Sequence, residues 1–105
     1  AASDVYKRQC LLDEAGCFGI TLEKVPAALA QRVTAAVSCP TIGIGAGSDT
    51  DGQVLVYADA LGMTHGFKPK FLRYFADIEG CMTQGVQDYI QAVKNVSFPN
   101  ENERY

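Results

Sequence analysis

The chain has no tryptophan, a single histidine and no pair of cysteines with only two residues between them. These gaps argue against a zinc site, because zinc is usually held by closely spaced Cys and His residues. It also has no run of basic residues, and its nine Lys and Arg are outnumbered by twelve Asp and Glu. Nucleic acid and anionic membranes are therefore not expected partners. We expect small-molecule ligands instead.

Long apolar runs are absent too, so no segment is expected to cross a bilayer. Without a secretory signal, the four cysteines are expected to be buried free thiols and the protein to be cytoplasmic. The content of 48% hydrophobic and 20% charged residues is that of an ordinary globular protein, and 105 residues allow at most one small domain.

The first nine residues are polar and basic and do not continue into the apolar pattern that follows. We expect residues 1–9 to be a non-native or disordered leader outside the fold, with an ordinary frayed terminus as the alternative. The other end of the chain is polar as well, and residues 100–105 are expected to form a tail.

Short apolar segments alternate with helical patterns in the first half of the chain. Cys10–Gly16 has the pattern of a helix end stopped by glycine, and Cys17–Leu22 that of a buried strand. Val25 and Pro26 open a helix that should end near Ser38. Its apolar face is formed by Leu29, Val33, Ala36 and Val37.

Two further apolar runs, Thr41–Ile44 and Val54–Tyr57, are expected to be strands. Short apolar strands separated by helices are typical of a parallel sheet covered on both faces. The expected fold class is therefore α/β.

The second half of the chain shows helical patterns only. Pro69–Ala76 is expected to be a short helix or an aromatic packing segment, and residues 79–94 a longer helix. Gly85 within it should cost about 1 kcal/mol relative to alanine. One apolar stripe runs along this helix: Met82, Val86, Tyr89, Ile90 and Val93.

About three parallel strands cannot close a sheet, and an open sheet would leave edges and apolar faces uncovered. The order of elements matches the last part of a (β/α)8 TIM-type barrel, which typically needs about 250 residues. We therefore expect residues 10–99 to be the C-terminal part of a barrel domain.

Glu23 follows the first expected strand, at the end of the strand that forms the active-site face of such barrels. The strand is apolar, and apolar surroundings make a carboxylate a stronger base. Glu23 is therefore a candidate catalytic base. It could equally pair with Lys24 or cap the helix that opens at Pro26, and the residues alone do not separate these interpretations.

Ile42–Gly47 carries three glycines at the end of a strand. Such glycines allow an anion to approach backbone N–H groups, but the run has neither a dinucleotide fingerprint nor a P-loop. A tight turn is favoured. The anion site remains as an alternative function, a phosphate- or nucleotide-binding half-barrel module without catalysis.

Three aspartates and the basic residues after them complete the candidates. Asp49 and Asp51 are expected to cap a helix or to make loop hydrogen bonds rather than to bind metal, because their spacing matches no known metal motif. Asp59 is expected to close the third strand and line the site. No role is assigned to His65, Lys68 and Lys70.

Four segments in order resemble the ketopantoate hydroxymethyltransferase family: Leu22–Pro26, Ile42–Gly47, Asp51–Val56 and Pro69–Phe71. The resemblance covers residues 10–99. It implies a (β/α)8 barrel that forms homo-oligomers, commonly decamers. It also implies a pantothenate-biosynthesis reaction that transfers a hydroxymethyl group from 5,10-methylenetetrahydrofolate to 3-methyl-2-oxobutanoate with Mg²⁺, giving 2-dehydropantoate (ketopantoate).

The same resemblance implies that Glu23 is the proton acceptor of this reaction. The family's magnesium ligands and the groups that hold the oxo acid lie on earlier strands, which have no counterpart in this sequence. We therefore expect no metal ligand and no identified substrate-binding residue in this chain, and no activity from the chain alone.

Overall fold

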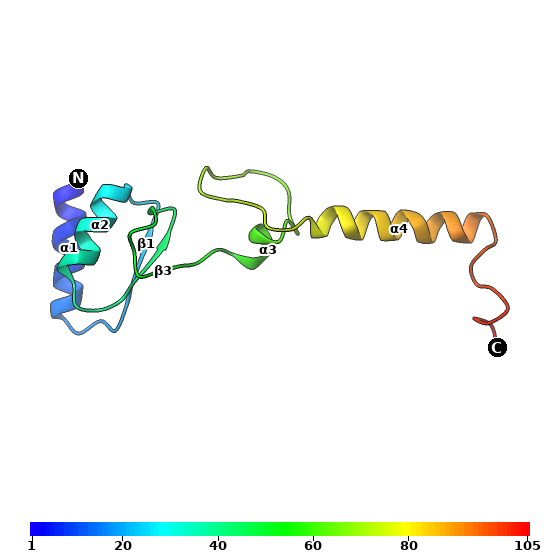
Figure 1. The fold of residues 1–105 in the computed structure, drawn as a ribbon, viewed down its shortest axis with the longest axis horizontal. Helices are drawn as coiled ribbons and strands as arrows, with labels where there is room; N and C mark the ends of the chain where they lie inside the picture. Colours follow the sequence, from blue (N-terminus) through cyan, green and yellow to red (C-terminus); the bar gives the residue numbers. More distant parts are fainter. The chain divides into compact units, whose positions relative to one another are not determined.

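The computed structural model describes all 105 residues, which form two compact units. Unit 1 consists of residues 1–56 with the short segment 69–72, and unit 2 consists of residues 57–68 and 73–105. Figure 1 labels helices and strands of unit 1 and the two helices of unit 2. Each unit is described by itself.

Unit 1 contains a parallel sheet of three strands, in the order β1 (Ile20–Glu23), β2 (Thr41–Ile44) and β3 (Gly52–Gln53). Ile20 is paired with Thr41 and Glu23 with Ile44. The predicted α/β class with parallel strands is confirmed. These three strands form an open sheet, so the expected barrel stays a prediction.

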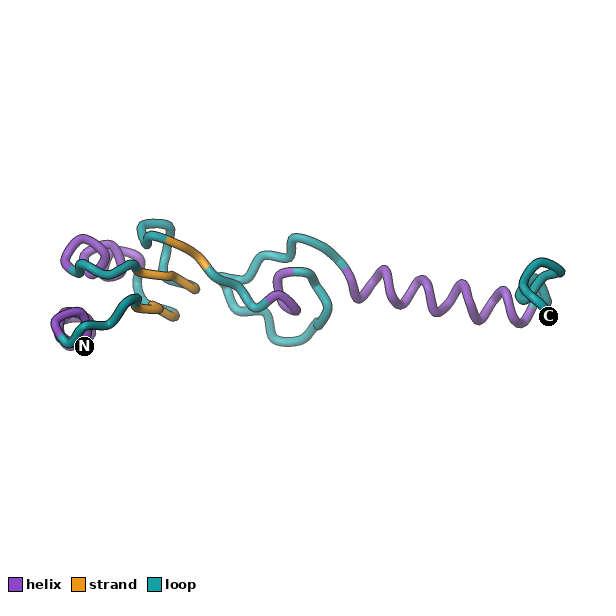
Figure 2. Tube along the Cα trace, turned by 90° about the horizontal axis from the view of Figure 1, so that it is seen from below, coloured by secondary structure: helices purple, strands orange, loops and turns teal.

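Two helices, α1 (Ala2–Glu14) and α2 (Ala27–Ala36), belong to the same unit, and Figures 1 and 2 both show them on one side of the strands. Leu29 and Val33 of α2 are buried in one cluster with Ile20 and Leu22 of β1. Burial of this apolar surface is the main source of stability in unit 1.

The two faces of the sheet differ in burial. Along β1, Ile20 and Leu22 are buried, whereas Thr21 and Glu23 are exposed. Side chains alternate between the faces of a strand, and neighbours in a parallel register share a face. The helices therefore cover one face of the sheet, and Glu23 lies on the other.

The first nine residues are not a disordered leader in this structure, because α1 runs through residues 2–9. Val5 and Tyr6 pack against the core cluster, and the guanidinium of Arg32 lies 5.0 Å from the centre of the Tyr6 ring. The segment therefore has one side that packs on the core, although most of its residues are polar and its composition predicted no packing. That the segment is non-native stays a prediction.

The strand boundaries differ from those expected at two places. β1 is Ile20–Glu23 rather than Cys17–Leu22, so that Glu23 is part of the strand, and the third strand is Gly52–Gln53 rather than Val54–Tyr57. Val54 N–H still donates to the carbonyl of Gly43 at 3.0 Å. The residues after Val54 have no partner on β2, because β2 ends at Ile44. The apolar run Val54–Tyr57 therefore leaves the sheet.

Asp51 anchors the start of β2. Its carboxylate accepts hydrogen bonds from the Thr41 N–H at 2.8 Å and the Thr41 hydroxyl at 3.1 Å. The Thr41 side chain is fully buried and also shares a 2.8 Å hydrogen bond with the hydroxyl of Thr34. This network satisfies the buried hydroxyl, as buried polar groups require, and confirms the expected loop hydrogen bonding of Asp51.

Asp13 ties the end of α1 to the loop before β2. Its carboxylate accepts from the N–H of Ser38 at 2.8 Å, the hydroxyl of Ser38 at 2.9 Å and the N–H of Cys39 at 3.0 Å. The hydrogen bond from the Ser38 N–H is the main reason that the pKa of Asp13 lies below its ordinary value. The helix end is thereby held against the loop by a charged acceptor.

Unit 2 contains α3 (Tyr57–Ala60) and α4 (Ile78–Lys94). The predicted helix over residues 79–94 is confirmed, and its first turn is capped by the Asp77 carboxylate, which accepts from Gly80 N–H at 3.0 Å. No residue of α4 is buried, and the apolar stripe stands exposed. None of the helices has the length and apolar character needed to cross a membrane.

The segment expected to be a short helix, Pro69–Ala76, forms no helix. Its first part makes a turn in which Leu72 N–H donates to the Pro69 carbonyl at 3.0 Å. Leu72 is buried. The alternative of a packing segment is the one that the structure supports.

Candidate active site

Glu23 is the last residue of β1, and its strand partner is Ile44, the last residue of β2. The strand ends sharply here because Lys24 adopts the left-handed conformation with φ +51°, which non-glycine residues seldom do. Lys24 N–H donates to the Ile44 carbonyl at 2.9 Å. Glu23 is therefore fixed at the carboxyl end of the sheet by backbone geometry on both sides.

Neither structural alternative for Glu23 is formed. The ion pairs of the chain include neither Glu23 nor Lys24. The N-cap of α2 is Pro26, and no side chain caps this helix. Glu23 thus has neither of the two roles that would compete with a chemical one.

The expected apolar surroundings of Glu23 are not present in this chain. Its side chain is exposed, because the alternation along β1 turns Glu23 away from the core that Leu22 enters. The sequence predicted a carboxylate at the end of this strand. It did not predict that no apolar residues of the chain would cover the face of the sheet on which Glu23 lies.

The glycine run forms the turn that the sequence favoured. Gly45 and Gly47 have φ +66° and +80°, a region that glycine adopts without steric cost. A Cβ at Gly45 would lie 2.6 Å from Phe71 Cδ1, and one at Gly47 would lie 2.6 Å from the Cβ of Ala27. Both conformation and packing therefore require glycine here, which supports the tight-turn interpretation.

A shallow cavity of about 360 Å³ lies beside this turn. Its walls come from the glycine turn, from β3 and from the segment 69–72, and they combine backbone, two polar side chains and one aromatic ring. The lining residues are Gly45, Gly47, Ser48, Gln53 and Phe71.

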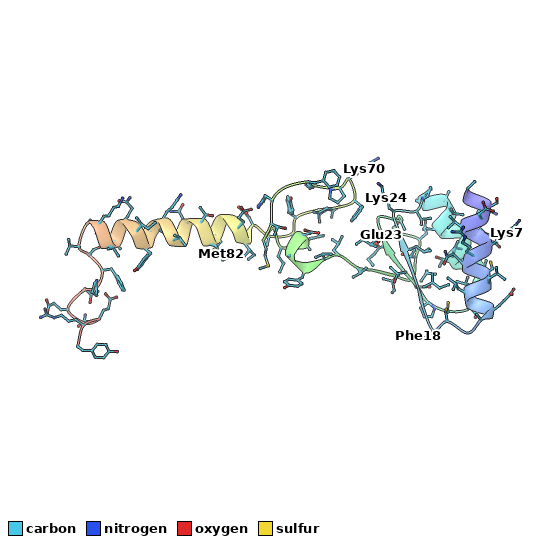
Figure 3. All side chains as sticks on the ribbon, turned by 180° about the vertical axis from the view of Figure 1, so that it is seen from behind. Lys7, Phe18, Glu23, Lys24, Lys70 and Met82 are labelled. Carbon is cyan, nitrogen blue, oxygen red and sulfur yellow. The ribbon has the colours of Figure 1, made fainter.

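The segment Pro69–Leu72, which we call the strap, crosses this end of unit 1. Phe71 packs on Gly45 and Leu72 is buried. The strap therefore carries Lys70 to the end of the sheet where Glu23 and Lys24 lie, and Figure 3 shows all three labelled side chains there. The sequence analysis assigned no role to Lys70. Its neighbour Phe71 and its contact Gly45 lie in two of the four segments that resemble the family, and this was the one signal in the sequence that could have singled out the strap.

The remaining acidic candidates lie elsewhere. Asp49 is exposed in the loop after the glycine turn. Asp59 does not close a strand as expected, because the chain has already left the sheet; it lies on α3 and accepts a 3.3 Å hydrogen bond from the Thr64 hydroxyl. Asp59 was expected to line the Glu23 site because it was expected to end the third strand. Since it lies on α3 instead, that argument no longer applies.

Two basic candidates make contacts inside unit 2. His65 contacts the carboxylate of Glu79, and its ring centre lies 5.2 Å from that of Tyr74. The Lys68 ammonium lies 4.6 Å from the centre of the same Tyr74 ring, a cation–π distance. Both side chains are thus engaged with neighbours inside unit 2, and no role in the Glu23 site is assigned to them.

The cysteines are all free, but they are not uniformly buried. Cys10, Cys17 and Cys39 are partly buried and Cys81 is exposed, so the expectation of burial is wrong for Cys81, which lies on the uncovered α4. Partial burial and, next to it, the Asp13 carboxylate raise the pKa of the Cys39 thiol. This keeps Cys39 in its unreactive protonated form.

Comparison with known proteins identifies the family. The sequence model of ketopantoate hydroxymethyltransferase matches residues 1–101, a range that includes the first nine residues. The chain is 59% identical over 95 residues to the 3-methyl-2-oxobutanoate hydroxymethyltransferase of Bacteroides fragilis, covering 90% of this chain and 35% of that protein.

Other relatives of the same name give a consistent result. Identity is 57% over 95 residues with the protein of Bacteroides thetaiotaomicron, again covering 90% of this chain and 35% of that protein. It is 52% over 94 residues with that of Salinibacter ruber, covering 90% and 36%. The chain spans about a third of the length of these relatives. It belongs to the ketopantoate hydroxymethyltransferase family.

Proposed function

We propose that this chain is the base-bearing part of an enzyme that transfers a hydroxymethyl group from 5,10-methylenetetrahydrofolate to 3-methyl-2-oxobutanoate, giving 2-dehydropantoate. Membership of the family supports the reaction. The placement of Glu23 at the carboxyl end of β1, without a competing structural role, supports its part in it.

In this proposal Glu23 removes the hydrogen from the carbon next to the ketone. The C–H bond breaks, the proton moves to the Glu23 carboxylate, and the electron pair passes into an enolate. The enolate carbon then forms a C–C bond to the methylene carbon of the folate while one of the two C–N bonds of that carbon breaks. Water replaces the second nitrogen, which supplies the hydroxyl of the product and releases tetrahydrofolate. A positioned general base typically contributes about 10²–10⁴-fold to such a step.

Magnesium is part of the proposal, but not through residues of this chain. No three His, Cys, Asp or Glu side chains stand close enough together here to hold a metal ion. The residues present therefore do not make a magnesium site. We place its ligands in the part of the longer relatives that this chain does not span.

The proposed whole protein is a (β/α)8 barrel that assembles as a homo-oligomer in the cytoplasm. The sheet supports the barrel: Thr21 and Glu23 lie on a face that no element of unit 1 covers, and a parallel sheet is normally covered on both faces. In a closed barrel that face would line the interior and its mouth.

The proposal can be tested in a chimera that joins this chain to the upstream two thirds of the Bacteroides fragilis protein. The assay follows exchange of the C3 hydrogen of 3-methyl-2-oxobutanoate with deuterated water. Glu23→Gln should lower the exchange rate by about 10²-fold or more. Glu14→Gln, an exposed carboxylate at the end of α1, should leave it unchanged.

Undiminished exchange in Glu23→Gln would refute the assignment of the base. The isolated chain should show no exchange, since it spans about a third of the relatives it matches. Exchange by the isolated chain would contradict the division of the site between two parts of the protein.

A further inference from the structure

The strap Pro69–Leu72 is attached to the strand ends by packing. The Phe71 ring carbons lie so close to Gly45 that a Cβ there would come within 2.6 Å of Cδ1 and 2.9 Å of Cγ. Leu72, the next residue, is only 7% exposed. A turn closed by the hydrogen bond from Leu72 N–H to the Pro69 carbonyl completes the attachment. Lys70 lies inside this turn.

The contacts connect Lys70 to Glu23 step by step. Gly45 directly follows Ile44, and Ile44 is the strand partner of Glu23 and the acceptor of the Lys24 N–H. Phe71 on Gly45 thus sets the strap at the end of β2, beside the end of β1. Figure 3 agrees, since Glu23, Lys24 and Lys70 are labelled at this end of the sheet.

Two lysines, Lys24 and Lys70, lie at this end of the sheet together with the Glu23 carboxylate. Lys24 and Lys70 are exposed, and neither is part of an ion pair. The Lys68 ammonium, in contrast, is engaged with Tyr74. A lysine ammonium at the entrance of a site attracts anionic groups and binds them as a point charge.

We propose that Lys70 is a substrate-binding residue that pairs with a carboxylate of a substrate at the Glu23 site. The inference rests on the proposed function, because that function supplies the substrates. Two of them carry the required group: the 2-oxo acid has a carboxylate next to its ketone, and the folate donor has carboxylates on its glutamate. The strap holds Lys70 in place while its side chain stays free to meet either one.

The test uses the chimera with Lys70→Met, which removes the charge but keeps a long apolar side chain. The KM for the substrate that Lys70 binds should rise about tenfold or more, with kcat unchanged. Lys70→Arg should restore much of the affinity. Lys68→Met is the matched control, two residues away and engaged with Tyr74, and it should leave both KM values unchanged.

Two assays separate the sources of the carboxylate. The deuterium exchange assay contains no folate, so a raised KM there assigns Lys70 to the 2-oxo acid. A KM raised only for the folate donor in the full transfer reaction assigns it to the glutamate. In that case a donor without glutamate should be used equally well by the Lys70→Met and unsubstituted chimeras.

Unchanged KM values for both substrates would overturn the inference while leaving Glu23 as base untouched. Acetylation with acetic anhydride gives a readout that needs no turnover. Either 3-methyl-2-oxobutanoate or tetrahydrofolate should protect Lys70 and not Lys68. Equal labelling of Lys70 with and without both compounds would refute the proposal even if the chimera were inactive.

Discussion

Units 1 and 2 contain amphipathic helices of the same general kind, yet only one of the units uses them to build a core. In unit 1, α2 buries Leu29 and Val33 against β1. In unit 2, α4 has a longer apolar stripe, and none of its residues is buried; Met82 is 63% exposed. An apolar stripe predicts that a helix needs a surface to cover, but not that the same chain supplies it.

The largest contrast between the units should come from truncating apolar side chains. Leu22→Ala removes a side chain that is 2% exposed and should lower the free energy of unfolding by about 2–5 kcal/mol. Val86→Ala in α4, where the valine is 57% exposed, should change it by less than about 0.5 kcal/mol. Urea titration followed by circular dichroism measures both, and equal losses would contradict the comparison.

Gly45→Ala tests the attachment of the strap to unit 1. The left-handed φ of +66° and the nearby Phe71 ring should make this change cost about 1–3 kcal/mol. Gly66→Ala is the control, because nothing lies within 4 Å of its Cβ position. A melting temperature lowered equally by both changes would mean that Phe71 does not hold the strap on Gly45.

Gly85→Ala should have a smaller effect, of opposite sign, in unit 2. Nothing lies within 4 Å of the added methyl group, and alanine is favoured over glycine inside a helix by up to about 1 kcal/mol. The helical signal in circular dichroism should therefore increase or persist to higher temperature. A loss of signal would show that the glycine makes a close contact that α4 needs.

The smallest effect concerns the carboxylate of Asp13 in unit 1. Hydrogen bonds from Ser38, first among them the one from its N–H, hold the pKa of Asp13 below its ordinary value. A carboxylate with a lowered pKa in the folded state stabilises above its ordinary pKa, and this contribution is lost as the pH falls through the folded value. Asp13→Asn should flatten the acid side of the stability profile. An unchanged profile in urea titrations from about pH 6 to pH 2 would contradict this.

Local patterns were enough to predict some elements. Thr41–Ile44 is a strand with the expected ends, since it is apolar and bounded by Pro40 and Gly45. The capped helix α4 was also predictable from its apolar period and from a polar residue before it. In these segments the residues that decide the structure are neighbours in the sequence.

Features decided by distant residues were not predictable in this way. The third strand is set by which residues find a partner on β2, and not by the apolar run Val54–Tyr57. The contact of Phe71 with Gly45 joins residues 26 positions apart, and Lys70 owes its place to that contact. The position of Glu23 could be predicted because it follows directly from the strand end.

The alternation of side chains along β1 determines two things at once: which residues are buried in the core and which way Glu23 points. A register shift of one position would put Glu23 in the apolar core and Leu22 on the opposite face. The free energy that favours a buried leucine therefore also sets the direction of the carboxylate beside it. A substitution that weakens the packing of Ile20 or Leu22 can thus misdirect the proposed base without touching it.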